Sequence, residues 1–305
     1  VYRLGGRPGG PFMRLPFAVN RMTGLVGLGL REGCDELIGQ IVEIGRLPGA
    51  GPYRRTGRLW QAIFANLDGA FVTDASIDEI TATLPPGSSG RWLWESVRLC
   101  SRIERGDLTP GDADTVESTL TAIVPFGPLV WPHLAIASAC HAMTGGLDHA
   151  RRLAAVFLDD IDTLSRHPER PFAWRWLPDV AFELDDEAAA ATLLPFVEAY
   201  RGQILVGSTA IPLGAADRAL GILHTVLGDF DEAELLFRTA LALERGMRSR
   251  PLALRTNLAL ARLWSLRRGP GDDARARALA GSIAQEAADL GMVGVRDAAA
   301  LVANR

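Results

Sequence analysis

Between residues 133 and 149 the sequence gathers four side chains that could bind a metal ion, His133, Cys140, His141 and His149. Imidazole nitrogen and thiolate sulfur are preferred ligands of Zn²⁺. On one continuous helix, however, residues eight apart point about 80° apart, and His149 follows a Gly-Gly turn. The sequence therefore favours helix packing for these side chains, and it predicts no metal site and no cofactor.

Other reactive side chains lack the pattern that ion binding or catalysis needs. Asp159, Asp160 and Asp162 are close together on an expected helix, where their carboxylates point in different directions and no EF-hand Gly or closing Glu follows. The serines of "PGSSGRW" and "VGSTA" do not follow a clear strand, as the nucleophile of a hydrolase does. We expect no catalytic residue and a protein that is not an enzyme.

The composition is typical of a folded protein from a reducing compartment. The chain has 305 residues, a formal net charge of −4 and 48% hydrophobic residues, which suffices for a sizeable core. Its 3 cysteines form no CxxC pair, so we expect no disulfide framework and a cytoplasmic location. All 32 basic residues are Arg, which indicates a bacterial genome of high GC content. Because no basic block is present, the sequence predicts no nucleic-acid binding.

An uncharged stretch raises the question of a membrane span. No Asp, Glu or Arg occurs from residue 118 to residue 146. Pro125, Pro128 and Pro132 would break a spanning helix near its middle. We therefore expect no contact with a membrane.

Apolar residues recur with helical spacing along most of the chain. The expected helices lie at 17–31, 34–46, 55–67, 76–83, 90–105, 112–123, 131–143, 147–165, 171–184, 187–200, 214–227, 230–245, 251–267, 273–290 and 294–303. The apolar run 203–213 fits a strand or an extended loop instead. Residues 1–16 form a Gly/Pro-rich lead-in that begins at Val1, so we expect a fragment of a longer protein.

Two of these helices have the most regular pattern, and they should form an antiparallel hairpin. In "GAADRALGILHTVLGDFDEAELLFRTALALE", the small residues Gly221 and Ala233 allow the two backbones to approach closely. Asp229 with Glu232 indicates a capping box at the start of the second helix, and Gly246 can end that helix in a left-handed conformation.

This hairpin resembles the tetratricopeptide repeat at the positions that define it. The matching residues are Leu220, Gly221, Gly228, Asp229, Ala233, Phe237 and Ala240, whereas His224 stands where that family usually carries Tyr. Looser copies place small residues of successive second helices at Ala150, Ala190, Ala233 and Ala276, which are 40, 43 and 43 residues apart. A unit of that family has about 34 residues.

The resemblance implies an all-α superhelical solenoid of antiparallel helix hairpins, with a degenerate period in the low 40s. Residues 17–130 would hold degenerate repeats, and residues 131–305 would hold tetratricopeptide-like repeats of the same continuous solenoid. Each hairpin of such an array hides only part of its apolar surface, so stability would come from stacking between neighbours.

The segment with this longer repeat spacing is similar to the C-terminal region of large bacterial signalling ATPases. That group includes LuxR-type regulators and nucleotide-cyclase-linked ATPases. The phrases "RPLALRTNLALARL" and "GPGDDARARAL" carry this likeness. A phosphate loop is excluded because its pattern requires Lys. The resemblance therefore implies the non-catalytic scaffold or sensor portion of such a regulator, with roles in signalling and transcription regulation. Its partner would be another protein or a linked ATPase or output domain.

By analogy with tetratricopeptide repeats, the partner-binding groove comprises Arg218, Ile222, Thr225 and Thr256. Arg218 would pair with an acidic group of a protein partner, and Ile222 would supply apolar contact. A second interpretation stays open, in which the superhelix encloses a small-molecule ligand and gates a linked ATPase or transcription-regulator module.

Two W-x-W pairs bear on that second interpretation, because tryptophan rings could line such a pocket. Trp92 with Trp94, and Trp174 with Trp176, are two residues apart, so both rings of a pair cannot share one helical face. We expect one ring of each pair in the core and the other on a groove or a surface.

Overall fold

The computed structural model describes residues 15–85, 88–123, 132–207 and 210–304. Most of the predicted lead-in, 1–16, lies outside these residues. The described chain is 78% helical and contains little sheet, which confirms the mostly helical class expected from the sequence.

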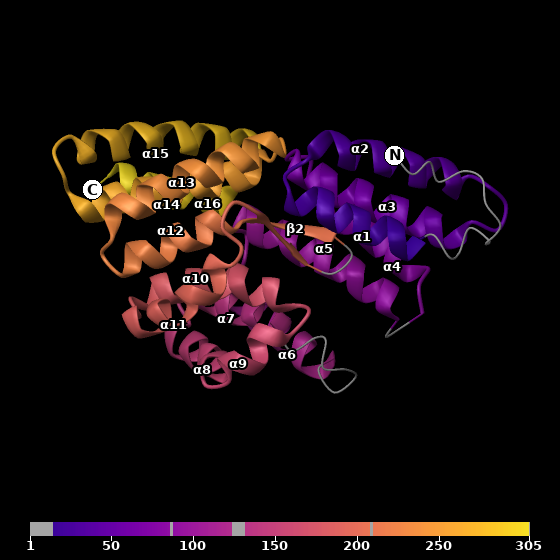
Figure 1. The fold of residues 1–305 in the computed structure, drawn as a ribbon, viewed down its shortest axis with the longest axis horizontal. Helices are drawn as coiled ribbons and strands as arrows, with labels where there is room; N and C mark the ends of the chain where they lie inside the picture. Colours follow the sequence, from indigo (N-terminus) through magenta and orange to yellow (C-terminus); the bar gives the residue numbers. More distant parts are fainter. Residues whose placement is uncertain (1–14, 86–87, 124–131, 208–209, 305) are drawn as a thin grey trace.

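The helices and strands fall into three groups along the chain (Figure 1). The first comprises α1 (Leu15–Gly27), α2 (Arg31–Gly45), α3 (Gly51–Leu67), α4 (Asp74–Ala82) and α5 (Ser89–Arg105). The second comprises α6 (Pro110–Ile123), α7 (Leu134–Met143), α8 (Leu147–Leu158), α9 (Ile161–Arg166), α10 (Arg170–Leu184) and α11 (Glu187–Glu198). The third comprises β1 (Ile204–Gly207), β2 (Ile211–Ala215), α12 (Ala216–Val226), α13 (Phe230–Gly246), α14 (Arg250–Arg267), α15 (Asp272–Asp289) and α16 (Val293–Ala303).

The hairpin of α12 and α13 packs as its small residues predict. A Cβ on Gly221 would lie only 2.7 Å from Cε1 of Phe237, so the absence of a side chain lets the ring rest on the backbone of α12. The spaced alanines Ala150, Ala190, Ala233 and Ala276 are all buried, on α8, α11, α13 and α15. Each of these four helices packs against the helix that immediately precedes it in the chain.

The ends of α13 differ from the expected capping. The Asp229 carboxylate does not bond the helix backbone, because its Oδ2 lies 3.0 Å from Nδ1 of His224 instead. Glu232 accepts a hydrogen bond from Arg201 at 2.9 Å rather than from the cap. Gly246 is the last helical residue, and the left-handed conformation falls at Arg248, with φ 57°.

Two segments differ from or refine the expected helices. The segment 147–165 is not one helix, because Asp159 and Asp160 form a turn between α8 and α9. The segment 203–213 contributes to an antiparallel pair of strands, β1 and β2, with an irregular register between Leu205 and Val206. Most side chains of this small sheet are buried, which explains its continuous apolar run.

Helix α10 is enclosed on several sides, since it packs against α7, α8, α11, α12 and β1. Trp174 and Trp176 are therefore both buried, each only 1% exposed. Neither ring of this pair lies on the surface, because α10 has no free face, although Trp176 lines a small cavity of about 50 Å³. Trp94 is also buried, and the side chain of Trp92 lies outside the described residues.

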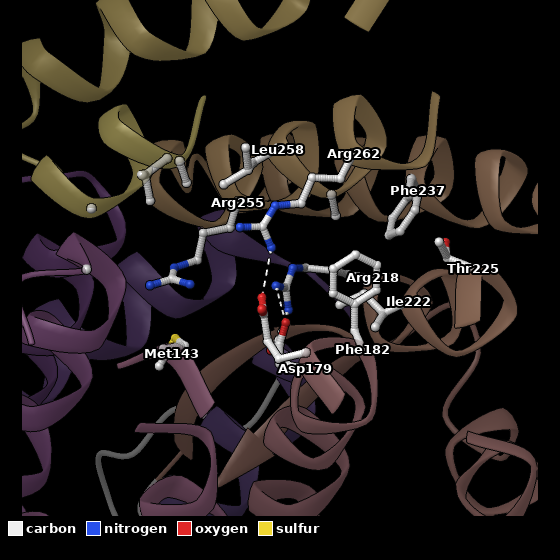
Figure 2. A pocket seen from close by; sticks show the side chains of 16 residues that line it. Met143, Asp179, Phe182, Arg218, Ile222, Thr225, Phe237, Arg255, Leu258 and Arg262 are labelled. Atoms are coloured by element: carbon white, nitrogen blue, oxygen red, sulfur yellow. Dashed lines mark hydrogen bonds and ion pairs between the residues drawn. The ribbon is translucent and has the colours of Figure 1, made fainter. Parts of the chain in front are cut away.

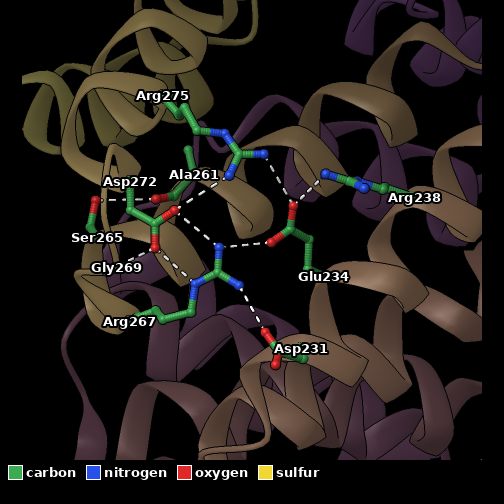
Figure 3. Close-up of polar contacts among 9 residues, drawn as sticks. All are labelled: Asp231, Glu234, Arg238, Ala261, Ser265, Arg267, Gly269, Asp272 and Arg275. Atoms are coloured by element: carbon green, nitrogen blue, oxygen red, sulfur yellow. Dashed lines mark hydrogen bonds and ion pairs between the residues drawn. The ribbon is translucent and has the colours of Figure 1, made fainter.

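Charged side chains join α13, α14 and α15 at the "RRGPGDD" turn (Figure 3). Arg267 lies 2.8 Å from both Asp272 and Glu234, and Arg275 reaches Glu234 at 3.3 Å. The Asp272 carboxylate also accepts a hydrogen bond from the backbone N–H of Gly269 at 2.9 Å. This network fixes the turn that begins α15.

Among the helices of the described residues, none is long and apolar enough to cross a membrane.

Candidate functional site

A cavity of about 230 Å³ lies where helices of all three groups meet (Figure 2). Its walls come from α10, α12, α13, α14 and α16, with Gly106 after α5 and Met143 of α7 at the edge. Three arginines line it, Arg218, Arg255 and Arg262, and we call it the arginine cavity.

Three of the four predicted groove residues come together here. Arg218, Ile222 and Thr225 all line the arginine cavity from α12, although each is largely buried. Thr256 does not join them, because its side chain is fully buried and its hydroxyl donates to Oε2 of Glu244 at 2.7 Å. Three of the four predicted groove residues therefore share one cavity, whereas Thr256 faces the core; their role in partner binding stays a prediction.

Arg218 is already paired within the chain. Its Nη2 donates to Oδ1 of Asp179 at 2.8 Å, and Arg175 contacts the other carboxylate oxygen of the same residue. Burial opposes ionisation of Asp179, but the charges of Arg218 and Arg175 outweigh that effect, so the pKa of this carboxyl lies below its usual range. Asp179 is thus a fixed anion between two buried cations.

Arg255 is held at the end of α5. Its Nε lies 2.7 Å from Oε2 of Glu104, and its Nη2 donates to the backbone carbonyl of Ile103. A cation near the C-terminus of a helix also interacts favourably with the helix dipole. Arg255 therefore fastens α14 to α5 while it lines the arginine cavity.

Arg262 is the most accessible of the three arginines. Its side chain is 35% exposed, and its Nη1 donates to Oε1 of Glu183 at 3.0 Å. The guanidinium also lies 5.8 Å from the centroid of the Phe182 ring. A partly exposed ion pair of this kind is weak, so Arg262 can exchange Glu183 for another anion.

The charges around the cavity do not balance when Glu244 is protonated and the other carboxylates are ionised. Four arginines contact three carboxylates here: Arg175, Arg218, Arg255 and Arg262 face Glu104, Asp179 and Glu183. The fourth carboxyl, Glu244, is fully buried, and burial raises its pKa to about 7 although Thr256 and Arg218 act against that rise. The cluster therefore carries one excess positive charge when Glu244 is protonated.

The remaining wall is apolar. It is formed by Met143, Phe182, Ile222, Phe237, Leu258 and Val295. The hydroxyl of Thr225 donates to the backbone carbonyl of Gly221 at 2.7 Å, so its proton is already used. Arginine donors beside apolar surface suit the binding of an anionic group with a short apolar body.

Two glycines close one side of the cavity. Gly106 has φ +69° at the end of α5, and Gly294 lies in the first turn of α16. A Cβ on Gly294 would lie 2.2 Å from the carbonyl oxygen of Gly106, so the two backbones touch directly. No larger residue fits at position 294 without separating α5 from α16.

The thiols are not placed for chemistry. Burial raises the pKa of Cys100 and of Cys140 to about 12, and that of Cys34 to about 11. The thiolate is the reactive form of cysteine, and at neutral pH all three thiols are protonated.

Sequence reasoning missed the residues that face α12 across the cavity. Arg255, Leu258, Ala259 and Arg262 occupy one stripe of α14, and Asp179, Phe182 and Glu183 occupy one stripe of α10. The first set follows the spacing i, i+3, i+4, i+7, which marks one helical face. Arginines at both ends of an otherwise apolar stripe were the available signal, but the sequence did not show which helices meet.

No protein-family model matches this chain, and no curated protein matches it. The likeness to the repeat regions of signalling ATPases therefore stays a prediction from the sequence.

Proposed function

We propose that this chain is a non-catalytic binding region of a bacterial regulatory protein. Its hairpins would belong to a tetratricopeptide-like solenoid with a period in the low 40s, and the arginine cavity would receive an acidic group of a protein partner. The observation that supports this function most is the lining of the cavity, in which Arg218, Arg255 and Arg262 stand beside Phe182, Ile222 and Leu258.

The contacts of the arginines assign them different parts in this proposal. Arg218 and Arg255 are buried or nearly so and are held by Asp179 and Glu104, so their charges are largely compensated and they form the fixed base of the cavity. Arg262 is partly exposed and holds only Glu183, so it is the side chain that an incoming carboxylate contacts first. The apolar wall then accepts the part of the partner next to its carboxylate.

A second candidate function is the sensing of a small anionic molecule. The volume of about 230 Å³ favours it, because the space is below the range of about 300–1,000 Å³ for larger ligands and fits one small carboxylic acid. Occupancy would then be passed to a linked ATPase or output module. The tryptophan lining expected for such a sensor is not found among the described residues of the cavity.

Peptide binding tests the first function. Labelled heptapeptides with one Glu beside Leu or Phe are compared with counterparts that carry Gln, by fluorescence anisotropy. We expect the acidic peptides to bind more tightly, and Arg262→Ala to weaken them about tenfold, which corresponds to about 1.4 kcal/mol. Arg250→Ala is the matched control, since Arg250 lies on the same helix, pairs with Glu286 at 3.1 Å and does not line the cavity.

Two outcomes would contradict the proposal: equal binding of the Glu and Gln peptides, or equal effects of the two arginine variants. The same proteins are titrated with phenylacetate by calorimetry. Binding of phenylacetate that requires Arg262, without binding of the peptides, would favour the small-molecule function over the protein partner.

A further inference from the structure

Three helices of the second group bring two imidazoles and a carboxylate together away from the residues of the arginine cavity. Oε2 of Glu117, on α6, lies 2.8 Å from Nε2 of His141 on α7 and 2.7 Å from Nε2 of His149 on α8. The two imidazole rings stack with centroids 4.3 Å apart. One potential ligand atom from each residue lies within 4.8 Å of the other two.

The turn between α7 and α8 produces this convergence. Gly145 has φ +87°, and the backbone N–H of Gly146 donates to the carbonyl of His141 at 2.8 Å. The chain reverses there, so the first turn of α8 places His149 over His141. The angle between residues eight apart on one helix does not apply to this pair, because the two histidines lie on different helices.

We propose that Glu117, His141 and His149 form a binding site for Zn²⁺, with solvent as the fourth ligand. Two imidazole nitrogens and one carboxylate oxygen are a ligand set that Zn²⁺ accepts with an open position. His141 is buried, whereas the side chains of Glu117 and His149 are 25% and 38% exposed, so solvent reaches one side of the site.

To hold the ion, the site must open between Glu117 and the two histidines. Ligand atoms bonded to tetrahedral Zn²⁺ at about 2.0–2.1 Å are about 3.3–3.4 Å apart. The present contacts of 2.7 and 2.8 Å must therefore open by about half an ångström. Glu117 and His149 can move by that amount because neither side chain is fully enclosed.

Without metal, the same three residues form a hydrogen-bonded group, and Arg152 favours that state. Nη2 of Arg152 lies 3.0 Å from Nδ1 of His149. Because arginine only donates, Nδ1 accepts, and the ring proton sits on Nε2, facing Glu117. Zn²⁺ at Nε2 requires that proton to move to Nδ1 and Arg152 to withdraw. Arg152 is exposed, so it is free to do so, and it competes with the metal.

A bound ion would fasten α6 to the hairpin of α7 and α8. This inference does not depend on what occupies the arginine cavity, since the two sites share no residue. Metal binding to the folded chain would raise its melting temperature by mass action, because the unfolded chain does not assemble the three ligands.

Calorimetric titration of the metal-stripped full chain with ZnCl₂ tests the site, and visible absorption of added Co²⁺ reports tetrahedral coordination. We expect one equivalent of Zn²⁺ to bind, and both His149→Ala and Glu117→Gln to weaken it at least about tenfold. Arg152→Ala should bind Zn²⁺ more tightly than the wild type. His224→Ala is the matched control, because His224 contacts a single carboxylate, Asp229, at 3.0 Å.

The melting temperature of each variant without metal shows whether it is folded, and His149→Ala is the safest variant because its side chain is partly exposed. The proposal is overturned if the wild type binds no Zn²⁺, or if His149→Ala and Glu117→Gln bind it as the wild type does. Weaker binding by Arg152→Ala would overturn the competition between Arg152 and the metal. Equal loss in His224→Ala would show that the titration does not report this site.

Discussion

Arg218 of α12 and Asp179 of α10 form a largely buried ion pair at the wall of the arginine cavity, with 2.8 Å between Nη2 and Oδ1 and the Asp179 side chain 19% exposed. The pair joins the second and third groups of helices. It also limits how Arg218 can act, because this side chain already has an internal anion. In the proposed function, a partner's acidic group would therefore meet Arg262 before Arg218.

Asp179→Ala should destabilise the fold strongly. The change leaves Arg218 and Arg175 buried without the carboxylate between them, and breaking a buried pair costs about 3–5 kcal/mol. Urea denaturation measures this loss. The exposed pair of Arg250 and Glu286 supplies the comparison, since Glu286→Ala should cost less than about 1 kcal/mol. Similar midpoints for Asp179→Ala and the wild type would show that the buried pair does not form.

Glu244 should make stability depend on pH. Burial raises its pKa from 4.5 to about 7 in the folded chain. The stability that protonated Glu244 contributes is therefore fully present below about pH 4.5 and is lost as the pH rises through 7. At about 1.4 kcal/mol per pKa unit, the loss approaches about 3 kcal/mol. Glu244→Gln removes the ionisation, and we expect this variant to be more stable than the wild type at pH 8.

Thermal or urea unfolding of both proteins at pH 5, 6, 7 and 8 measures this difference. The two stability curves should approach each other toward pH 5 and separate toward pH 8. A stability difference between the two proteins that stays constant from pH 5 to pH 8 would show that Glu244 is already ionised in the folded state at acidic pH.

The hairpin of α12 and α13 should depend on its closest contact. Phe237 is buried and rests on Gly221, so Phe237→Ala should cost about 3–5 kcal/mol, and Ala233→Leu should overpack the same interface by about 1–3 kcal/mol. Leu235→Ala is the control, because Leu235 is exposed on the same helix. If neither core variant lowers the melting temperature further than Leu235→Ala does, α12 and α13 do not pack through Phe237 and Ala233.

The hairpin could be predicted because its pattern is local. Gly221 and Phe237 are 16 residues apart on consecutive helices and are in contact. Helical periodicity within this short segment is enough to predict that the two helices pack together. The prediction of a capping box at Asp229 was wrong for a local reason too, because His224 competes for the Asp229 carboxylate. Propensity alone does not rank two partners for one side chain.

The arginine cavity could be predicted only in part. Arg218, Ile222 and Thr225 line it from α12, and the analogy with tetratricopeptide repeats places these three residues in one groove. Asp179 lies 39 residues before Arg218, and nothing local in the sequence indicates that α10 and α12 meet. Glu117 was missed beside the histidines for the same reason, because it comes from α6. Sites built from several helices depend on tertiary packing, which periodicity does not report.

Replacing glycine by alanine should have opposite effects on stability at Gly294, which contacts Gly106, and at Gly281, which has open space around it. Gly294→Ala puts a Cβ where the carbonyl oxygen of Gly106 lies, 2.2 Å away, so α5 and α16 must separate at a cost of about 1–3 kcal/mol. Gly281 lies within α15 with nothing within 4 Å of an added Cβ, and Gly281→Ala should stabilise the chain by about 0.5–1 kcal/mol. Thermal denaturation of both variants gives the two signs. If Gly294→Ala raises the melting temperature as Gly281→Ala does, the α5 and α16 backbones do not touch, and the arginine cavity is open on that side.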